Sequence, residues 1–448
     1  MFVSRTGQTG TATTGGLDEE TRKDQAGYAV GPVQIHRVQS INYSFDITRQ
    51  DINQFGQLAA IDRQIIEQPT VSLDFSYYCE TGSNERVMGL DVIRATGTFS
   101  DTTVFNTHGV AGANAVSCIS GILKGDSRSH DINGNSDAAR TDIMTYFIQT
   151  YAEGDDAVGS TSGPKSVISI GNGFMSSYSA NGSVGDFVTA DVSIEALNMQ
   201  FEDGATDLIQ DPTINESDGK LQYGITGSEG VGQGAGNGGR IHMPEAYDGI
   251  QNLTSDNLAG VIDNTNQPKA LRHGDVQLVL SDVSLGHQLN GAEVHAQNFT
   301  FSFDLSRTNL ERLGSRFAYA KEIDFPLSAS CDFNFIVGDV SGSQGGANST
   351  KAEGVEAFLN QGYDTKANLF VNCFGPSTGA YSSDNNANLD GMGFGLLGAQ
   401  LDSQGYSSSI GDNKTMDVSF SAQIAGPQDT NNGVTIYHVA DGGADNTP

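Results

Sequence analysis

One glycine-rich stretch has the spacing of a phosphate-binding loop. Gly234, Gly236 and Gly239 match the pattern G-x-G-x-x-G, which binds phosphate when it follows a strand and opens a helix. No strand pattern precedes these glycines, and the residues RIHMP follow where the helix should begin. The stretch therefore favours a flexible connection, and the sequence predicts no cofactor.

A second stretch, DNNANLDG from Asp384, imitates a calcium-binding loop. Leu389 stands where such a loop needs glycine, and Gly395 stands where it needs the bidentate glutamate. The eight histidines are scattered without the spacing of metal ligands. Turn chemistry is the better interpretation of this stretch, and the sequence predicts no metal site.

Nucleophiles and carboxylates show no catalytic arrangement either. No Ser, Cys or carboxylate pair has a recognisable catalytic setting, so the sequence predicts no catalytic residue and no enzyme. The four cysteines are far apart and lack C-x-x-C spacing, which favours buried free thiols over a zinc site or a disulfide framework. They are Cys79, Cys118, Cys331 and Cys373.

Three pairs of aspartates are the remaining candidates for a functional surface. Each pair occupies matching places in two similar stretches of the chain, on the strand face opposite the apolar residues. A solvated outer surface would explain them, and so would a single wet, negative space lined by all of these faces. The candidate acids for such a space are Asp46 with Asp304, Asp74 with Asp332, and Asp191 with Asp417.

The elements that position these acids occur twice in the sequence. Residues 38–77 align without a gap with residues 296–335, and eleven of the forty positions are identical. GDFVTADVSIEA from Gly185 matches GDNKTMDVSFSA from Gly411, and a weaker match joins TYFIQTY from Thr145 to NLFVNCF from Asn368. The blocks keep their order over a period far longer than that of a solenoid repeat, which predicts a duplicated domain.

The repeated blocks predict an all-β fold with short helices, built from tandem antiparallel β-sandwich or barrel domains. Ile41, Tyr43 and Phe45 alternate with polar residues, and the later blocks alternate in the same way. Thr48 and Ser306 are plausible helix N-caps, and Gly56 and Gly314 stand where a glycine would end a short helix. We therefore expect a small helix after the first strand of each copy.

The changing offset between the blocks gives the expected domain boundaries. Copy 1 carries about 35 extra residues (258 minus 223), which fall in a long insert. The expected parts are an N-terminal arm at 1–32, copy 1 at 33–200 with its insert at about 84–140, a linker or small insert at 201–275, copy 2 at 276–430, and a C-terminal tail at 431–448. The arm, residues 1 to about 26, has few apolar residues, so we expect assembly to order it.

The charge of the chain excludes one class of function. With 54 acidic and 23 basic residues, the formal charge is −31. Affinity for nucleic acid comes mainly from Lys and Arg, so this composition argues against a nucleic-acid-binding protein. The start of the sequence lacks the apolar core of a signal peptide, and no run of eighteen apolar residues predicts a membrane span.

The first repeated block resembles the major tail tube proteins of bacteriophages with long, non-contractile tails. The similarity lies in VQSINYSFDITRQDINQFGQLAAIDRQIIEQPTVSLDFSYYCETGSNERVMG, and covers Val33 to about Gly89 and, through the repeat, Val294 to about Gly338. The resemblance implies β-sandwich domains whose strands join those of neighbours into one barrel. The sequence resembles the variant of this family with two fused domains per chain, in which three chains form a pseudo-hexameric ring. The insert and residues 201–275 are not explained by it.

The resemblance also implies a role, a location and partners. The chain would be a structural virion protein of a siphovirus, a homotrimer whose rings stack into the tail tube, the channel for DNA ejection. Its partners would be itself, with the tape measure, tail terminator and tail-tip proteins. Genomic DNA would pass without specific binding, no membrane would be involved, and assembly would take place in the host cytoplasm.

Two alternatives stay open on the sequence. One is another duplicated β-structural virion protein, such as a tail-tip hub or a head decoration protein. The other is a β-sandwich that binds or cleaves glycans. A glycan site usually presents exposed aromatic residues, often Trp, and this chain has no Trp.

Overall fold

The structure is a computed structural model of the whole chain. It describes residues 1–5, 33–65, 68–90, 92–96, 143–151, 153, 165–205, 208–210, 212–215, 220–223, 240–242, 270–271, 276–281, 296–314, 318, 320–336, 366–373, 391–407, 415–426, 429 and 432–440. Most of these residues lie in strands and very few in a helix, which confirms the all-β prediction.

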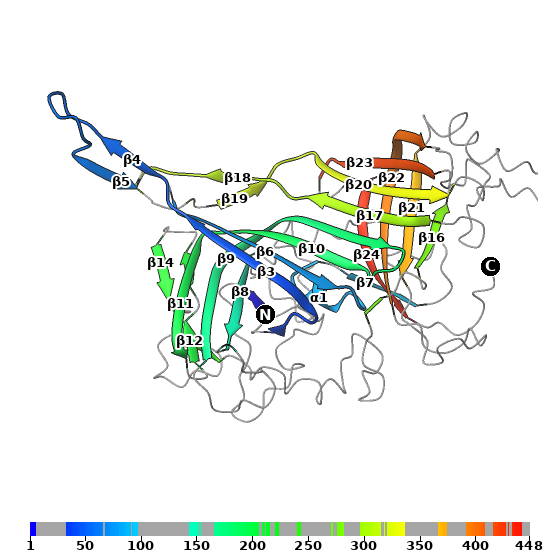
Figure 1. Ribbon diagram of the computed structural model, residues 1–448, viewed down its shortest axis with the longest axis horizontal. Helices are drawn as coiled ribbons and strands as arrows, with labels where there is room; N and C mark the ends of the chain where they lie inside the picture. The colour runs from blue at the N-terminus through cyan, green and yellow to red at the C-terminus, as the bar shows by residue number, and fades with distance from the viewer. Residues whose placement is uncertain are drawn as a thin grey trace, which may run out of the picture.

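Eight antiparallel strands form a continuous run that we call the central sheet (Figure 1). Four come from residues 1–205, the first half of the chain, and four from residues 276–440, the second half. Within this sheet the halves meet where β9 pairs with β17. In order across the sheet the strands are β3 (Val38–Asp46), β6 (Thr70–Tyr78), β10 (Thr189–Ala196), β9 (Lys165–Ser183), β17 (Ala296–Asp304), β20 (Leu327–Ile336), β23 (Thr415–Ile424) and β22 (Gly391–Ser407).

Two flanking sheets extend from the long strands β9 and β22. The first part of β9 pairs with β8 (Met144–Thr150) and β11 (Asn198–Ala205), and β8 pairs with β1 (Phe2–Arg5), which pairs with β2 (Val33–Gln34). The first part of β22 pairs with β21 (Ala367–Cys373) and β24 (Gly433–Ala440). β21 pairs with β16 (Val276–Ser281), and β24 pairs in parallel with β7 (Val92–Thr96). Figure 1 shows β21 and β24 running steeply across the direction of β17 and β20.

Alternation of apolar and polar residues explains which face of the central sheet is buried. In β6, Val71, Leu73, Phe75 and Tyr77 are buried, while the residues between them point to the other face. Strands β10, β17, β20 and β23 follow the same period. Burying a side chain of this size contributes about 1.5–3 kcal/mol, so the alternation fixes the register of each strand.

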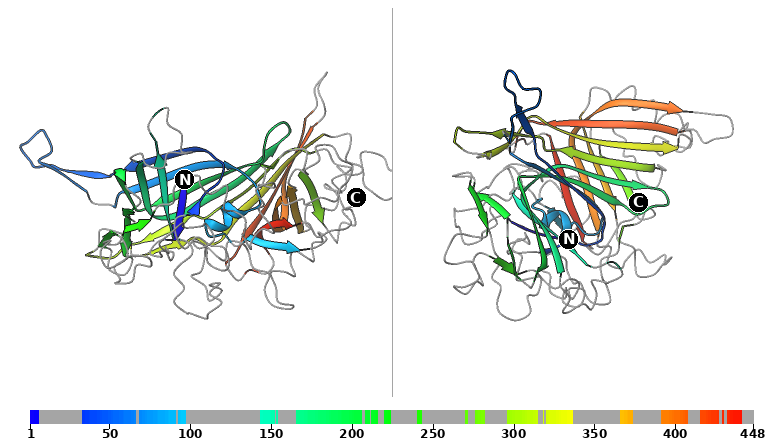
Figure 2. Two further views of the ribbon diagram at one scale, coloured as in Figure 1. Left: turned by 90° about the horizontal axis from the view of Figure 1, so that it is seen from below. Right: turned by 60° about the vertical axis from the view of Figure 1, so that its left-hand side comes forward.

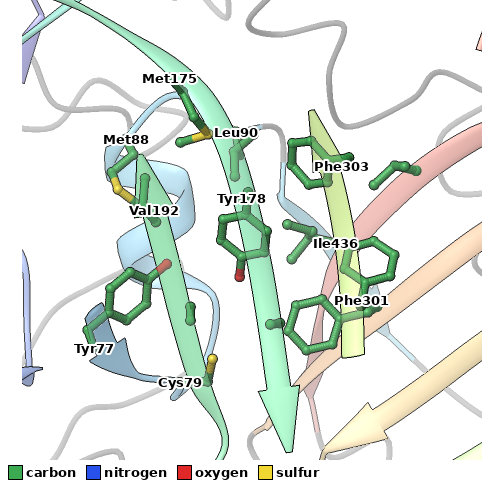
Figure 3. Close-up of a cluster of buried hydrophobic side chains, with 14 of the residues drawn as sticks. Tyr77, Cys79, Met88, Leu90, Met175, Tyr178, Val192, Phe301, Phe303 and Ile436 are labelled. Atoms are coloured by element: carbon green, nitrogen blue, oxygen red, sulfur yellow. The ribbon is translucent and has the colours of Figure 1, made fainter. Parts of the chain in front are cut away.

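One hydrophobic core runs through both halves. Tyr178 of β9 stacks on Phe303 of β17 with 5.3 Å between ring centroids. Phe301 of β17 packs at 5.2 Å from Phe394 of β22. Figure 3 shows Tyr178 lying between the Tyr77 side of the cluster and the rings of β17. Because the core is continuous across the β9–β17 junction, the two halves are packed as one body.

The short helix expected after the first strand of each half is wrong. Both segments form β-hairpins, β4 (Arg49–Ile52) with β5 (Asp62–Ile65), and β18 (Arg307–Leu310) with β19 (Ala320–Ile323). Gly56 and Gly314 do adopt positive φ, 99° and 91°, but they serve hairpin turns and not helix ends. The β4–β5 hairpin projects far from the body in both views of Figure 2.

The expectation that residues 1–26 cannot dock on their own domain is wrong for the start of the chain. Phe2 and Val3 are buried, and β1 lies between β2 and β8. At the other end, β24 lies within the expected tail at 431–448 and is an internal strand of a flanking sheet. These segments pair because each is a short apolar run beside an unpaired strand edge.

The described part of the expected insert, residues 84–90 and 92–96, also belongs to the core. It forms most of α1 (Ser83–Val87), the single helix within the described residues, and β7. Val87, Met88 and Leu90 are buried. In the expected linker, the described residues include the end of β11 and two small two-stranded sheets, β12 (Leu208–Gln210) with β15 (Arg240–His242), and β13 (Pro212–Asn215) with β14 (Lys220–Tyr223).

The aligned stretches of the two halves form matching elements. β3, β4 and β5 begin and end 258 residues before β17, β18 and β19. Strands β9 and β22 each contain a β-bulge. The bulge of β9 is at Ser176, opposite β10, and the bulge of β22 is at Asp402, opposite β23, so the two bulges are 226 residues apart in the sequence. A bulge is a specific local feature, so its recurrence at the same offset as the matched GDFVTADVSIEA and GDNKTMDVSFSA blocks adds to the correspondence.

Candidate functional site

The candidate site is the face of the central sheet opposite the core, which we call the polar face. The strand registers place all six candidate acids on this face. Asp74 faces Ser193, Asp191 faces Ser76 and Ser179, Asp332 faces Thr300 and Ser419, and Asp417 faces Asn334; Asp304 faces Ser177 and Asp46 faces Thr70. The structure therefore brings together on one surface the acids that the sequence placed only on separate strands.

Small hydroxyl side chains fill most of the remaining positions of the polar face. They form cross-strand ladders in both halves: Ser40 with Ser76 at 2.6 Å, Ser44 with Ser72 at 2.7 Å, and Ser302 with Ser330 at 2.9 Å between hydroxyl oxygens. These pairs satisfy hydroxyl groups locally and contribute to strand pairing.

Several of the acids accept hydrogen bonds from neighbours on the polar face. Asn181 donates to Asp191 at 3.0 Å, Asn334 donates to Asp417, and Ser419 donates to Asp332. Five of the six acids are exposed, and Asp332 is half-buried. Asn and Ser donors therefore hold the carboxylates in place and leave their charge facing solvent.

The polar face carries negative charge without interspersed cations. The central-sheet residues of β3, β6, β10, β17, β20 and β23, with 174–183 of β9 and 400–407 of β22, include no Lys or Arg. Lys321, on the β18–β19 hairpin, forms an ion pair with Glu195 of β10, with 3.0 Å between Nζ and Oε2. A surface of carboxylates and hydroxyls without cations repels polyanions and offers phosphate no cationic partner.

Among the described residues, the polar face shows no candidate metal centre. In the part of the chain that the structure describes, no group of three or more His, Cys, Asp and Glu is placed to hold a metal ion. Gly234, Gly236 and Gly239, and the DNNANLDG stretch up to Asp390, lie outside the described residues. The arrangement of the polar face suits a passive, hydrated surface.

Sequence reasoning missed a buried carboxyl group in the first half. Glu85 of α1 is 1 % exposed, and its Oε1 accepts hydrogen bonds from Tyr77 at 2.6 Å and from Tyr178 at 3.1 Å. Burial raises the pKa of Glu85 above its ordinary value of 4.5, and the two tyrosine hydroxyls oppose part of that shift. In the second half, Phe335 corresponds to Tyr77 and Gln404 corresponds to Tyr178. The two tyrosine hydroxyls are therefore specific to the first half, and this difference between the matched blocks is the sequence signal that could have indicated the site.

Sequence reasoning also missed the two edges of the central sheet. Among the described residues, β3 pairs only with β6, and residues 400–407 of β22 pair only with β23. Apolar side chains that lie on core-facing positions are left exposed at these edges, with Tyr43 at 47 %, Phe45 at 44 % and Tyr406 at 58 %. An edge of this kind is a template for pairing with another chain.

Comparisons with known proteins identify no relative. No family model matches this chain, and a search of curated proteins finds no match. Among the described residues, no helix is long and apolar enough to span a membrane. The function must therefore be inferred from the polar face, the two edges and the correspondence between the halves.

Proposed function

We propose that this chain is a structural virion protein, the major tail tube subunit of a phage with a long, non-contractile tail. The observation that carries the proposal is the central sheet, which has one apolar face, one acidic polar face without cations, and an open edge at each end. A sheet with these properties suits a wall segment of a larger barrel whose lumen is the polar face.

The two halves are proposed to be duplicated tube domains. Support comes from the gap-free match between residues 38–77 and 296–335, the equal strand bounds in this region, and the corresponding bulges at Ser176 and Asp402. Each half contributes four strands to the central sheet. Two such domains per chain close a six-domain ring when three chains assemble.

The dimensions of such a ring fit a channel for duplex DNA. Three chains with eight central strands each would supply 24 strands. At a strand spacing of ~4.8 Å and a tilt of ~40°, the barrel would measure about 48 Å between backbones. Side chains on the polar face leave a channel that still admits a duplex, and their negative charge lets DNA slide without binding.

The proposed partners follow from this role. The chain would assemble with further copies of itself in stacked trimeric rings within the virion tail, formed in the host cytoplasm. The tape measure, tail terminator and tail-tip proteins would contact the tube at its inside and its ends.

Electron microscopy of the purified chain, with concentration and salt varied, tests the proposal. Tubes or stacked rings with three chains per ring are the expected result. Closed oligomers that never stack would favour a hub or decoration protein, and a chain that stays monomeric under all conditions would overturn the tube assignment. Six chains per ring would contradict the two-domain arrangement.

A further inference from the structure

The junction between the two halves shows how one tube domain of this chain joins the next. At this junction β17 pairs with β9 in a defined register, with Thr300 opposite Asn181, Phe301 opposite Ala180 and Phe303 opposite Tyr178. Phe299, Phe301 and Phe303 are all buried there, at 5 %, 0 % and 1 % exposure. The junction thus aligns the polar faces of both halves and buries the apolar face of β17.

The open edges of the central sheet are the counterparts of these two strands. β3 corresponds to β17, since their bounds differ by 258, and residues 400–407 of β22 correspond to the end of β9, displaced by 226. Tyr43 and Phe45 stand where Phe301 and Phe303 stand in the second half, yet they are 47 % and 44 % exposed. Phe301 and Phe303 lie beside the partner strand β9 and also pack on the rings of Phe394 and Tyr178, whereas Tyr43 and Phe45 have a paired strand, β6, on one side among the described residues.

The two edges carry none of the Lys, Arg or Pro residues that often keep edge strands apart, although each has a bulge, at Gln39 of β3 and at Asp402 of β22. β3 reads VQSINYSFD and residues 400–407 of β22 read QLDSQGYS, without Lys, Arg or Pro. The acids in these stretches are Asp46 at the end of β3 and Asp402 at the bulge. Edge strands that must not pair are normally protected by Lys, Pro or inward charges, so the composition of both edges favours pairing.

We infer that β22 of one copy pairs antiparallel with β3 of a second copy in the register of the β9–β17 junction. This inference rests on the proposed self-assembly and specifies its interface. Applying the two displacements places Asn42 opposite Ser407, Tyr43 opposite Tyr406, Ser44 opposite Gly405 and Phe45 opposite Gln404 of the neighbouring copy.

The same displacements predict one backbone contact outside the paired strands. Within the chain, the N–H of Leu305 donates to the carbonyl oxygen of the bulge residue Ser176 at 2.7 Å. The corresponding residues are Ile47 and Asp402. The bulge at Asp402 therefore presents a carbonyl group to the end of β3 in the neighbouring copy, and this contact fixes the register at that end.

Cysteine cross-linking between copies tests the register. One protein carries Asn42→Cys and a second carries Ser407→Cys; both carry Cys118→Ser, because Cys118 lies outside the described residues, while Cys79, Cys331 and Cys373 are buried. The two proteins are mixed, assembled, oxidised and separated without reductant. A second combination, Tyr43→Cys with Tyr406→Cys, covers the other pairing geometry, because facing pairs alternate along an antiparallel ladder.

A matched combination, Asn42→Cys with Ser403→Cys, is the control. Its two positions are offset by four residues, about 13 Å along the strands, which is beyond disulfide reach. We expect a reductant-sensitive dimer band in at least one facing combination, at least tenfold stronger than in the control. Equal cross-linking in the control, or none in either facing combination within assembled rings, would overturn the register while leaving the tube assignment standing.

Two further outcomes separate the inference from the proposed function. Cross-linking of the facing pairs in oligomers that form no tubes would support the register and contradict the tube assignment. A chain that stays monomeric at every concentration, measured by sedimentation, would overturn both.

Discussion

Lys321 forms an ion pair with Glu195, with 3.0 Å between Nζ and Oε2, although the two residues come from different halves of the chain. The Lys321 ammonium also lies 5.4 Å from the centre of the Phe174 ring, and the Arg307 guanidinium lies 5.0 Å from it. The β18–β19 hairpin thereby docks across the junction. Among the described residues, its counterpart Arg63, on β5, forms an ion pair with Asp51 within its own hairpin, where the two side chains are 66 % and 46 % exposed.

Removing Lys321 should therefore destabilise the chain, and removing Arg63 should not. Lys321→Ala loses a nearly buried cation, its ring contact and its ion pair, which we expect to lower the free energy of unfolding by about 1–2 kcal/mol. Arg63→Ala, the matched control, removes only a solvent-screened pair. Urea denaturation of both variants measures the difference, and equal effects would show that the hairpin is not held by this contact.

Substitutions at the corresponding residues Phe301 and Tyr43 should have different effects. Loss of the Phe301 ring should lower the stability of the chain, and loss of the Tyr43 ring should weaken assembly. Phe301→Ala should lower the free energy of unfolding by about 3–5 kcal/mol, because a fully buried ring is lost. Tyr43→Ala should change the unfolding of the monomer little and weaken assembly, because the ring is half exposed in the single chain and the proposed second copy would cover it. Denaturation and sedimentation of the same samples check this. Unchanged assembly of Tyr43→Ala would contradict the edge interface.

The stability of the chain should depend on pH through Glu85. Its folded pKa is raised above 4.5, so the folded state prefers the protonated carboxyl group. The stabilisation from this preference is complete below pH 4.5 and is lost as the pH rises through the folded pKa. Glu85→Gln keeps a hydrogen-bond acceptor for Tyr77 and Tyr178 but cannot ionise, so it should be increasingly more stable than the natural chain as the pH rises.

Denaturant unfolding of both proteins across pH 4–8 measures this difference. Glu322→Gln is the control, since Glu322 is an exposed carboxylate of β19. A difference between Glu85→Gln and the natural chain that is constant with pH would mean that Glu85 does not titrate in this range.

Lysines introduced on the polar face should convert a surface that repels DNA into one that binds it. With Asp74→Lys and Asp332→Lys together, assembled tubes should retain short duplex DNA at about 50 mM salt and release it at about 200 mM. Cosedimentation measures the retention. The control, Asp62→Lys with Glu322→Lys, makes the same charge change on the two hairpins. Equal retention by the control would place the lumen elsewhere.

The all-β class and the strands around the aspartates could be predicted because period-two alternation is strong there. Asp74 between Leu73 and Phe75 could point only away from the core. The hairpins were mistaken for helices because a glycine with positive φ serves a helix end and a turn equally well. Gln54 accepts the N–H of Gln57 at 3.1 Å across the turn that contains Gly56, and sequence spacing does not distinguish that bond from a helical one.

Non-local pairing was the part that the sequence could not supply. β1 and β24 are short apolar segments whose partners lie far away in the chain, with Phe2 opposite Phe147 and Ile436 opposite Phe394 and Val92. The site at Glu85 depends on two tyrosines from different strands. Their meeting is set by tertiary packing, for which a single sequence carries no local signal.

Strands β9 and β22 also have a mechanical consequence. Each runs without interruption from a flanking sheet into the central sheet, so covalent backbone, and not side-chain packing alone, joins the two layers of each half. When a load acts on the central sheet, the flanking sheet cannot slide away from it without stretching a continuous strand. Within the central sheet, the β9–β17 junction is crossed by strand pairing and side-chain packing and by no such continuous strand, so one half can bend relative to the other there more easily than a flanking sheet can slide on its own half.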